Sequence, residues 1–487
     1  MDHASSPPHP ELLALLRQVK ATPDDETLRL VLADWLDENA DATGLASPDD
    51  ARARAALIRV QLELARPTYD TARIVQLRAA EAQLLSVHAA RWLGALPQRL
   101  DELRRRKPFG FAAHRAPAVP QVFVLDPLAV SKPNNPWRFH RGLLTVDLFS
   151  SELLDPELGA WFAAPQAAWV EEAGVEIGGL AALERLEVPD ALRPYLGVRY
   201  ALGRAPPPSL HLVNPPVESL TPKRCRRLVR GRNFALVRAL TLYAPAIAAE
   251  VLTALVGANV SALLRLSVKA PIGDAGAGLL GAAPLVTLSA LDISGCAIGA
   301  DGLRLLARSA HLQQLVSLTA FRNQFGCAGA EALAASPMAG RLNVLEIQNT
   351  GIGDRGAAAL ADSPVLDRLV GPGLNLSMNP IGDDGAKALA ACPLLEPFTE
   401  LVLRDCHIGD AGVAALAGSP HVANLTYLDL WHNRVGDDGA RALAASPHLN
   451  GVRDLSLRDN RISAAGADAL RAKFAERVKV EVARSLR

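Results

Sequence analysis

Few residues of this chain have the types and spacing that catalysis or metal binding requires. Among its 11 histidines, His311, His421 and His448 follow equivalent Ser-Ala or Ser-Pro steps, while His407 and His432 occupy similar places in successive segments. A zinc site gathers three or four ligands at one point. The first three histidines are better interpreted as repeat positions, and the other two have no evident third ligand. We therefore expect neither a metal nor a cofactor.

Recurrent Gly-Asp pairs place carboxylates at regular intervals, at residues 273–274, 353–354, 382–383, 409–410 and 436–437. Calcium loops need acids in a D-x-D-x-D-G spacing, which is absent here. Each pair instead precedes an Ala- and Leu-rich helical pattern, and acids favour helix N-termini. Hydrolase, metalloprotease and Walker-type motifs are also absent. We therefore predict structural carboxylates and no catalytic residue.

Two basic segments, residues 104–107 and 223–232, could contact nucleic acid or an acidic partner. The second follows Thr221-Pro222, a typical helix start, so its cations would share one helix. Clustered Lys and Arg drive non-specific binding to phosphates. However, 51 basic residues balance 51 acidic ones, so no global field attracts nucleic acid or a membrane. A solvated helix face is the preferred interpretation.

Composition narrows the class of protein and its compartment. Hydrophobic residues make up 49% of the 487 residues, but aromatics only 5%, which suits thin repeated layers of small side chains. The five cysteines form no C-x-x-C pair, so neither a disulfide framework nor a zinc site is expected. The sequence has no signal-peptide pattern and no run of 18 apolar residues. We predict a cytoplasmic protein without a membrane span.

A 27-residue repeat dominates the C-terminal half. The segments starting at Leu425 and Val452 match at eight positions, and the same frame yields about nine units within residues 237–487. Leucines two residues apart face one side of a short strand. The Gly-Ala-x-Ala-Leu-Ala segment that follows predicts a short helix, which Ser-Pro ends because proline disrupts helices. One unit has no way to bury its apolar face alone, whereas a stack of units does.

A small residue follows each predicted strand where the chain turns away. These positions are Cys296, Asn323, Thr350, Asn379, Cys406, Asn433 and Asn460. We expect their side chains to hydrogen-bond the backbone of the neighbouring coil and to stack into a ladder. Cys296 and Cys406 are therefore interpreted as structural rather than redox-active.

The pattern L-x-x-L-x-L-x-x-N/C-x-I, as in residues 425–435, resembles the ribonuclease-inhibitor-like class of leucine-rich repeats. Helices such as residues 439–444 are similar to the bacterial GALA variety. The resemblance covers about half the chain. It implies an α/β leucine-rich repeat solenoid, a horseshoe with parallel strands on its concave side and helices on its convex side.

Residues 1–100 are predicted to form a small all-α domain that folds by itself. Thr22-Pro23-Asp24-Asp25 and Ser47-Pro48-Asp49-Asp50 are helix starts. The first precedes an apolar stripe of Leu28, Val31, Leu32, Trp35 and Leu36. Helical periodicity continues to about residue 92.

Two motifs in this segment, A-D-W-L at residues 33–36 and I-R-x-Q at residues 58–61, resemble the bacterial repeat-companion domain. That domain precedes repeats in planctomycete and myxobacterial proteins, and it implies no known activity. An insertion near residues 42–48 lengthens one loop. Ala56 replaces an acid usual in the family, which puts any role of that acid in doubt here.

Residues 101–236 are predicted to join the two domains through degenerate repeat strands. The candidate strands are Leu144/Val146/Leu148, Val175/Ile177, Leu186/Val188 and Leu210/Leu212. This region would cover the first regular coil. Residues 474–482 would add a last strand at the other end.

Strand positions that point away from the core form the predicted binding surface on the concave face. The candidate contact residues are Phe321, Arg404, Tyr427, Asp429, Trp431, His432 and Arg458. Aromatic residues and arginine dominate interaction hot spots. The competing interpretation is that Trp431 only shields its neighbours, because single exposed apolar groups are common.

These patterns predict a non-catalytic scaffold that binds a protein partner of unknown identity, and no small-molecule ligand. Three alternatives stay open. One is an F-box-like ubiquitin-ligase adaptor or effector, although residues 10–100 lack the expected L-P start. The others are nucleic-acid binding through residues 223–232 and an enzyme with an unrecognised site in residues 100–235.

Overall fold

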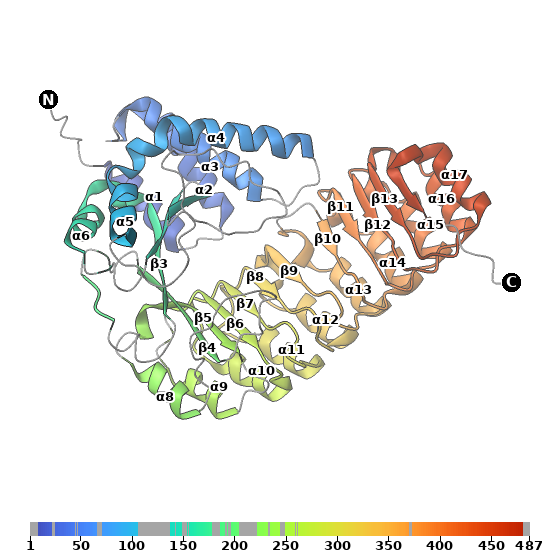
Figure 1. Ribbon diagram of the computed structural model, residues 1–487. Helices are drawn as coiled ribbons and strands as arrows, with labels where there is room; N and C mark the ends of the chain where they lie inside the picture. Colours follow the sequence, from blue (N-terminus) through green and yellow to red (C-terminus); the bar gives the residue numbers. More distant parts are fainter. Residues whose placement is uncertain are drawn as a thin grey trace. The chain divides into compact units, whose positions relative to one another are not determined.

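The computed structural model divides the chain into two compact units, residues 1–177 with 181–200 and residues 178–180 with 201–487 (Figure 1). The residues described are 8–105, 137–203, 222–369 and 373–480, except 22–24, 44, 46, 66–70, 142, 149–152, 154, 178–185, 190–191, 193–195, 232–233, 244–248, 259 and 261. The domain boundaries near residues 100 and 236, drawn from sequence pattern, stay a prediction.

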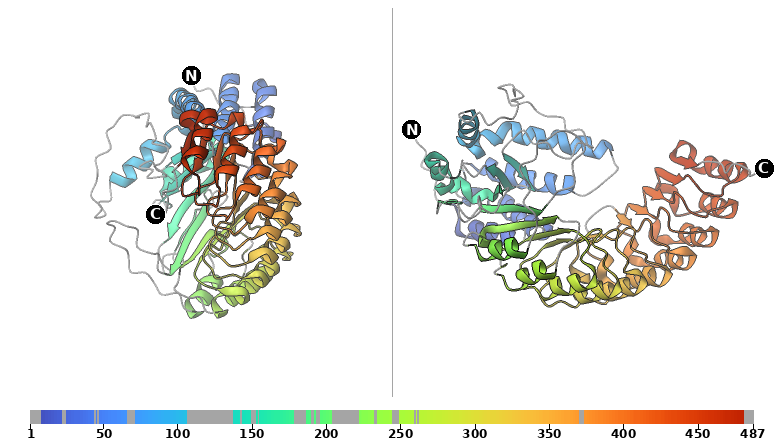
Figure 2. Two further views of the ribbon diagram at one scale, coloured as in Figure 1. Left: turned by 90° about the vertical axis from the view of Figure 1, so that its right-hand side faces the viewer. Right: turned by 60° about the horizontal axis from the view of Figure 1, so that its bottom comes forward.

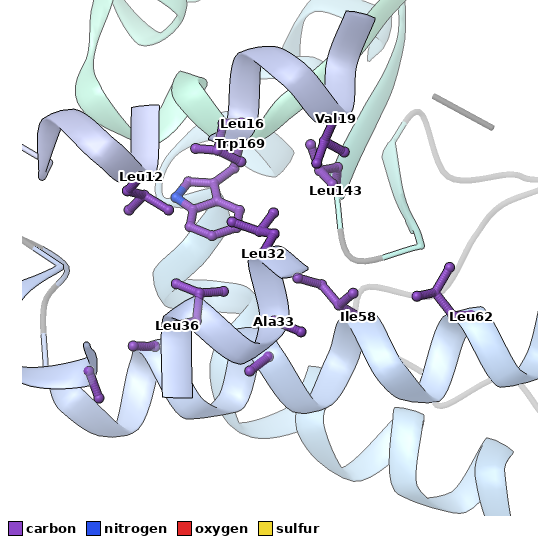
Figure 3. Close-up of a cluster of buried hydrophobic side chains, with 13 residues drawn as sticks. Leu12, Leu16, Val19, Leu32, Ala33, Leu36, Ile58, Leu62, Leu143 and Trp169 are labelled. Carbon is purple, nitrogen blue, oxygen red and sulfur yellow. The ribbon is translucent and has the colours of Figure 1, made fainter. Parts of the chain in front are cut away.

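Helices dominate the start of the first unit. They are α1 (Pro10–Ala21), α2 (Glu26–Glu38), α3 (Pro48–Ala65), α4 (Thr71–Leu93) and α5 (Leu96–Arg105), with a 3-10 turn at Ala40–Ala42. Leu12 and Leu16 of α1 and Leu32 and Leu36 of α2 lie around the Trp169 side chain, and Leu143 lies beside Val19 (Figure 3). Because Trp169 and Leu143 follow the helices in sequence, the helical segment shares its core with later residues.

The start and the buried face of α2 differ from the sequence prediction. Asp25 caps the helix by accepting hydrogen bonds from the backbone N–H groups of Thr27 (2.9 Å) and Leu28 (3.2 Å), whereas Thr22 lies outside the described residues. Val31 is 45% exposed, although the stripe placed it inward. Arg29 is fully buried instead. Its guanidinium donates to the Arg141 carbonyl at 3.1 Å and pairs with Glu171, so this face of α2 meets polar acceptors.

The two motifs of the helical segment are joined by an ion pair. Arg59 of I-R-x-Q binds Asp34 of A-D-W-L at 2.7 Å and also Asp37 at 2.6 Å. Gln61 donates to Glu81 at 2.7 Å and to the Phe139 carbonyl at 3.0 Å. The motif residues therefore tie α2 to α3, and α3 to α4 and the first strand.

Four strands follow the helices: β1 (Trp137–His140), β2 (Leu143–Leu148), β3 (Val170–Ile177) and β4 (Leu196–Gly203). Helix α6 (Pro156–Ala163) and a 3-10 turn at Pro165–Trp169 lie between β2 and β3. β1 is antiparallel to β2, while the β2–β3 and β3–β4 pairs are parallel. β2 and β3 contain two of the predicted strands. Leu186 and Val188 lie in no strand, and residues 210–212 are outside the described residues.

The second unit alternates short parallel strands with helices, and its strands line the inner side of an arc whose outer side is helical (Figure 2). Its strands are β5 (Val237–Tyr243), β6 (Arg265–Lys269), β7 (Ala290–Asp292), β8 (Ser317–Thr319), β9 (Val344–Glu346), β10 (Gly373–Asn375), β11 (Glu400–Val402), β12 (Tyr427–Asp429), β13 (Asp454–Leu457) and β14 (Val478–Val480). Its helices are α8 (Pro222–Arg230), α9 (Ala249–Val256), α10 (Gly273–Ala282), α11 (Ala300–Ala307), α12 (Gly326–Ala334), α13 (Asp354–Ala361), α14 (Gly382–Ala390), α15 (Asp410–Gly418), α16 (Asp437–Ala445) and α17 (Ala464–Phe474). The predicted α/β solenoid is confirmed.

Among the described strands of the solenoid, the pairing is interrupted between β9 and β10. β5 to β9 pair in parallel order, and β10 to β14 form a separate five-stranded sheet. The interruption coincides with a longer repeat, because the equivalent leucines Leu345 and Leu374 are 29 residues apart instead of 27. Beyond the strands, the backbone N–H of Asn349 still donates to the Ser377 carbonyl at 3.0 Å, so the coils remain connected.

Candidate binding surface on the strand face

The predicted ladder residue Asn433 binds backbone groups of two coils. Asn433 Oδ1 accepts hydrogen bonds from the backbone N–H groups of Cys406 (3.1 Å) and Ile408 (3.0 Å), and its Nδ2 donates to the carbonyls of Leu403 (2.7 Å) and Leu430 (3.0 Å). These bonds are buried, and the Leu430 carbonyl also accepts from Asn460 Nδ2 at 2.9 Å, which links Asn433 to the next ladder residue.

The other predicted ladder residues make related contacts. Each of the other asparagines (Asn323, Asn379 and Asn460) donates to a carbonyl of its own coil and to one of the preceding coil. The Thr350 hydroxyl donates to the Ile347 carbonyl. The thiols donate to carbonyls of the preceding coil, Cys296 to Val268 and Cys406 to Leu376. Burial raises the pKa of Cys296 to about 11 and that of Cys406 to about 12. Both thiols are therefore protonated donors at neutral pH.

The carboxylates of the Gly-Asp pairs form a second ladder that sequence reasoning missed. Asp410 begins α15, but its Oδ1 accepts from the backbone N–H groups of Gly436 (2.6 Å) and Gly439 (2.9 Å) at the start of the next helix. Asp383 does the same one coil earlier. A Cβ on Gly439 would lie 2.7 Å from the Asp410 oxygen, so the glycine makes room for the bond. The sequence contained a signal for this second ladder, because the Asp and the glycines that it bonds recur together in successive repeats.

A continuous row of residues follows the strands across the solenoid. We call Phe321, Gln348, Ser377, Arg404, Trp431 and Arg458 the strand-end row. The backbone N–H after each row residue donates to the carbonyl of the next one, for example Asp405 to Trp431 at 2.9 Å and His432 to Arg458 at 2.9 Å. The donating residues have φ between 51° and 61°, which turns the chain away from the strand. The row therefore has one residue per coil.

Asp429 is the centre of a hydrogen-bond network on this face. Its Oδ2 accepts from Arg404 Nε at 2.5 Å and from the Tyr427 hydroxyl at 2.7 Å, and its Oδ1 accepts from the Trp431 backbone N–H at 3.0 Å. Arg404 also donates to the Tyr427 oxygen at 3.1 Å. Asp429 is only 1% exposed. It therefore positions its neighbours and offers no exposed surface to a partner.

The network around Asp429 also affects the pKa values of Tyr427 and Arg404. Burial, followed by the bond to Asp429, raises the pKa of the Tyr427 hydroxyl to about 12. Burial opposes the charge of Arg404, but its hydrogen bonds to Asp429 and Tyr427 raise its pKa above the ordinary value. Tyr427 stays a neutral donor and Arg404 a cation at neutral pH.

The Trp431 ring is half-buried and held from the next coil. Its Nε1 donates to Asp459 Oδ2 at 2.7 Å, and the exposed His432 ring lies against it at 5.8 Å. Asp459 was not among the predicted residues, because its role depends on a contact between coils. Arg458 is exposed beside it. The structure thus gathers six of the seven predicted contact residues, whereas Phe321 lies four coils away in the row.

On the helical face of the solenoid, several charged side chains pair within single helices. Arg304–Asp301, Lys387–Asp384, Arg441–Asp438 and Arg471–Asp468 are ion pairs within single helices, three residues apart. Such exposed pairs contribute little stability and are typical of a solvated helix face.

The histidines and the basic segments are the remaining candidate sites. His421 pairs with Glu396 at 2.8 Å, and the described residues contain no group of three potential metal ligands. In α8, Cys225 and Leu228 are buried, while Lys223, Arg226 and Arg230 are exposed. The side chains of residues 104–107 are outside the described part. Within the described chain, no helix combines the length and apolar character that a membrane crossing needs.

A family profile for leucine-rich repeats matches residues 285–307, 342–361, 374–390, 396–417 and 423–444. These segments of the second unit are leucine-rich repeats. The matched segments lie between β7 and α16, leave out the coil with β8 and α12, and include Arg404, Trp431 and most of the ladder. No curated protein matches the chain.

Several solved structures are similar to this chain. An internalin from Listeria monocytogenes is 19% identical, with 66% of this chain and 77% of that chain covered and a TM-score of 0.38. The yeast Rad7–Elc1 complex is 13% identical, with 69% of this chain and 89% of that chain covered and a TM-score of 0.35. The leucine-rich repeat domain of APL1B is 14% identical, with 64% of this chain and 87% of that chain covered and a TM-score of 0.34. None of these likenesses bears on a particular function.

Proposed function

We propose that this leucine-rich repeat protein is a non-catalytic scaffold that binds a protein partner on its strand face. The observation that carries the proposal is the network in which Asp429 holds Arg404, Tyr427 and Trp431 in place. Binding side chains that are already fixed lose little conformational entropy on association. Trp, Tyr and Arg are also the residues that dominate hot spots.

The arrangement supports contact by Trp431 more than simple shielding. The indole Nε1 is bonded to Asp459 on the next coil, so the ring is anchored at its edge. The ring nevertheless remains partly exposed. A tryptophan that served only to cover its neighbours would gain by burying the whole ring.

The test is capture of partner proteins from the source cells by the full chain and by Trp431→Ala. We expect the substitution to lower affinity by about 2 kcal/mol or more, with the melting temperature almost unchanged. Arg441→Ala on the helical face is the control, because it removes an exposed arginine outside the surface. A lower melting temperature together with intact capture would assign Trp431 a structural role and place the site elsewhere.

We also propose the finer classes inferred from sequence. The repeats would belong to the ribonuclease-inhibitor-like class, and residues 1–100 would be a repeat-companion-like domain. The Arg59–Asp34 pair supports the second proposal, because it joins the two motifs of the resemblance directly.

A further inference from the structure

Helix α8 carries basic side chains that are not balanced by acidic ones. Residues 219–249 contain seven basic residues and no acidic residue. The exposed side chains among the described residues of α8 are Lys223, Arg226, Arg227 and Arg230. In α11, α14, α16 and α17, by contrast, a cation pairs with an aspartate three residues earlier. The positive charge of α8 is therefore not neutralised within its own helix.

These four side chains lie on one side of α8, and we call them the α8 basic stripe. Spacings of three, four and seven residues place side chains on the same side of a helix. The opposite side is fixed to the solenoid, because Cys225 and Leu228 are buried and the Cys225 thiol donates to the Val251 carbonyl of α9 at 3.4 Å. α8 lies beside α9 on the helical side of the solenoid (Figure 1). The stripe therefore points away from the core.

The α8 basic stripe destabilises the helix that carries it. Like charges three or four residues apart repel each other on a helix, and both Lys223 and Arg230 have Arg226 and Arg227 at these spacings. In the described part of the chain, no acidic side chain pairs with Lys223, Arg226 or Arg230. A surface that served only solvation would gain by mixing acidic with basic residues, as other helices of the solenoid do. An anionic ligand would remove the repulsion.

The chemistry of the stripe favours nucleic acid over a membrane or an acidic protein. A helix that binds a membrane surface adds large apolar side chains that enter the lipid, and the centre of a protein interface is depleted of charge. Every exposed side chain among the described residues of α8 is basic instead. Protein–nucleic acid interfaces are much more positively charged than interfaces between proteins.

We propose that the α8 basic stripe binds the phosphate backbone of a nucleic acid. Seven residues of an α-helix span about 10.5 Å, and each strand of a duplex carries one phosphate about every 3.4 Å along its axis. The stripe therefore meets about three phosphates of one strand. Phosphate contacts carry no sequence information, so binding is independent of sequence. This surface is separate from the strand face, and the inference goes beyond the proposed function.

The test measures binding of the full chain to short labelled nucleic acids of mixed sequence, as duplex DNA, duplex RNA and single-stranded DNA. With about three phosphates neutralised, the affinity for duplex DNA should fall about 40-fold between about 50 and about 200 mM salt. The triple variant Lys223→Gln/Arg226→Gln/Arg230→Gln should bind about tenfold more weakly or worse at the lower salt concentration, with a shallower salt dependence. Arg226→Lys/Arg230→Lys keeps the charges and should keep the salt dependence.

A matched triple variant removes the same charges from other helices. Lys387→Gln/Arg441→Gln/Arg471→Gln also loses one lysine and two arginines, all exposed on the helical side. It has the same net charge as the stripe variant, so it should bind nucleic acid within about twofold of the parent. The stripe variant should melt no earlier than the parent, because it removes like-charge pairs and keeps the buried Cys225 and Leu228.

No binding at the lower salt concentration, or equal losses in the two triple variants, would overturn the inference. Binding to phosphatidylserine vesicles or to polyglutamate without binding to nucleic acid would also overturn it, and would assign the stripe to a membrane or an acidic protein. Partner capture through Trp431 is a separate measurement on the strand face. Its result decides the proposed function whether or not the stripe binds nucleic acid.

Discussion

At the scale of the residue, the ladder positions show how one side chain can serve four backbone groups. Asn433 bonds two N–H and two carbonyl groups. We expect Asn433→Ala to cost about 1–3 kcal/mol of unfolding free energy, because buried backbone groups lose their partners. Asn433→Cys should cost less, since the Cys406 thiol already donates to Leu376 at an equivalent position. Thermal melts in which both variants equal the parent would contradict the ladder role.

Cys327 is a second informative residue, because it replaces the Asp that caps the next helix in other coils. Its sulfur lies 3.2 Å from where a Gly353 Cβ would be, the place that Asp383 oxygens occupy near Gly409. Cys327→Asp should therefore add an acceptor at the start of α13 and stabilise the protein by about 1 kcal/mol. Cys327→Ala is the control and should bring no gain in the denaturation midpoint. A stabilised Ala variant would point to another cause.

At the scale of the element, the sequence was most informative where the same unit recurs. A period of 27 residues predicts strand, turn and helix together, and the ladder residues follow from it. The network around Asp429 and the bond from Trp431 to Asp459 could not be derived, because they depend on which side chains meet between coils. In α2, periodicity alone placed Val31 inside, whereas ion pairing with Glu171 allows Arg29 to be buried.

The helical segment depends on elements that periodicity did not connect to it. Trp169 lies in the core of α1, α2 and α3, and it stacks on the Arg54 guanidinium at 4.1 Å. A fragment of residues 1–200 should therefore melt cooperatively, whereas residues 1–105 should not, and Trp169→Ala should cost the larger fragment about 3–5 kcal/mol. Calorimetry of both fragments is the measurement. A cooperative transition in the shorter one would support the independent folding expected from sequence.

At the scale of the whole molecule, the five cysteines report on the integrity of both the ladder and the solenoid. All five are free, and Cys327 alone among them is not buried. At pH 8 we expect a thiol reagent to modify Cys327 rapidly and the other four only after unfolding, since the thiolate is the reactive form. Cys327→Ser should abolish the rapid phase. Several fast thiols in the native protein would show that the coils are open.

The same thiols make stability depend on alkaline pH, with a definite sign. Burial raises the pKa of Cys225 and Cys296 to about 11 and that of Cys406 to about 12, from an ordinary 9.0. Above pH 9 the unfolded chain loses these protons first, so the native state binds more protons and the unfolding free energy falls as pH rises. Denaturation midpoints should decline between pH 9 and about 11. Cys406→Ala should lower the midpoint at pH 7 and make this decline shallower, because it removes one of the titrating groups. An unchanged slope would mean that Cys406 does not titrate differently in the folded and unfolded chains.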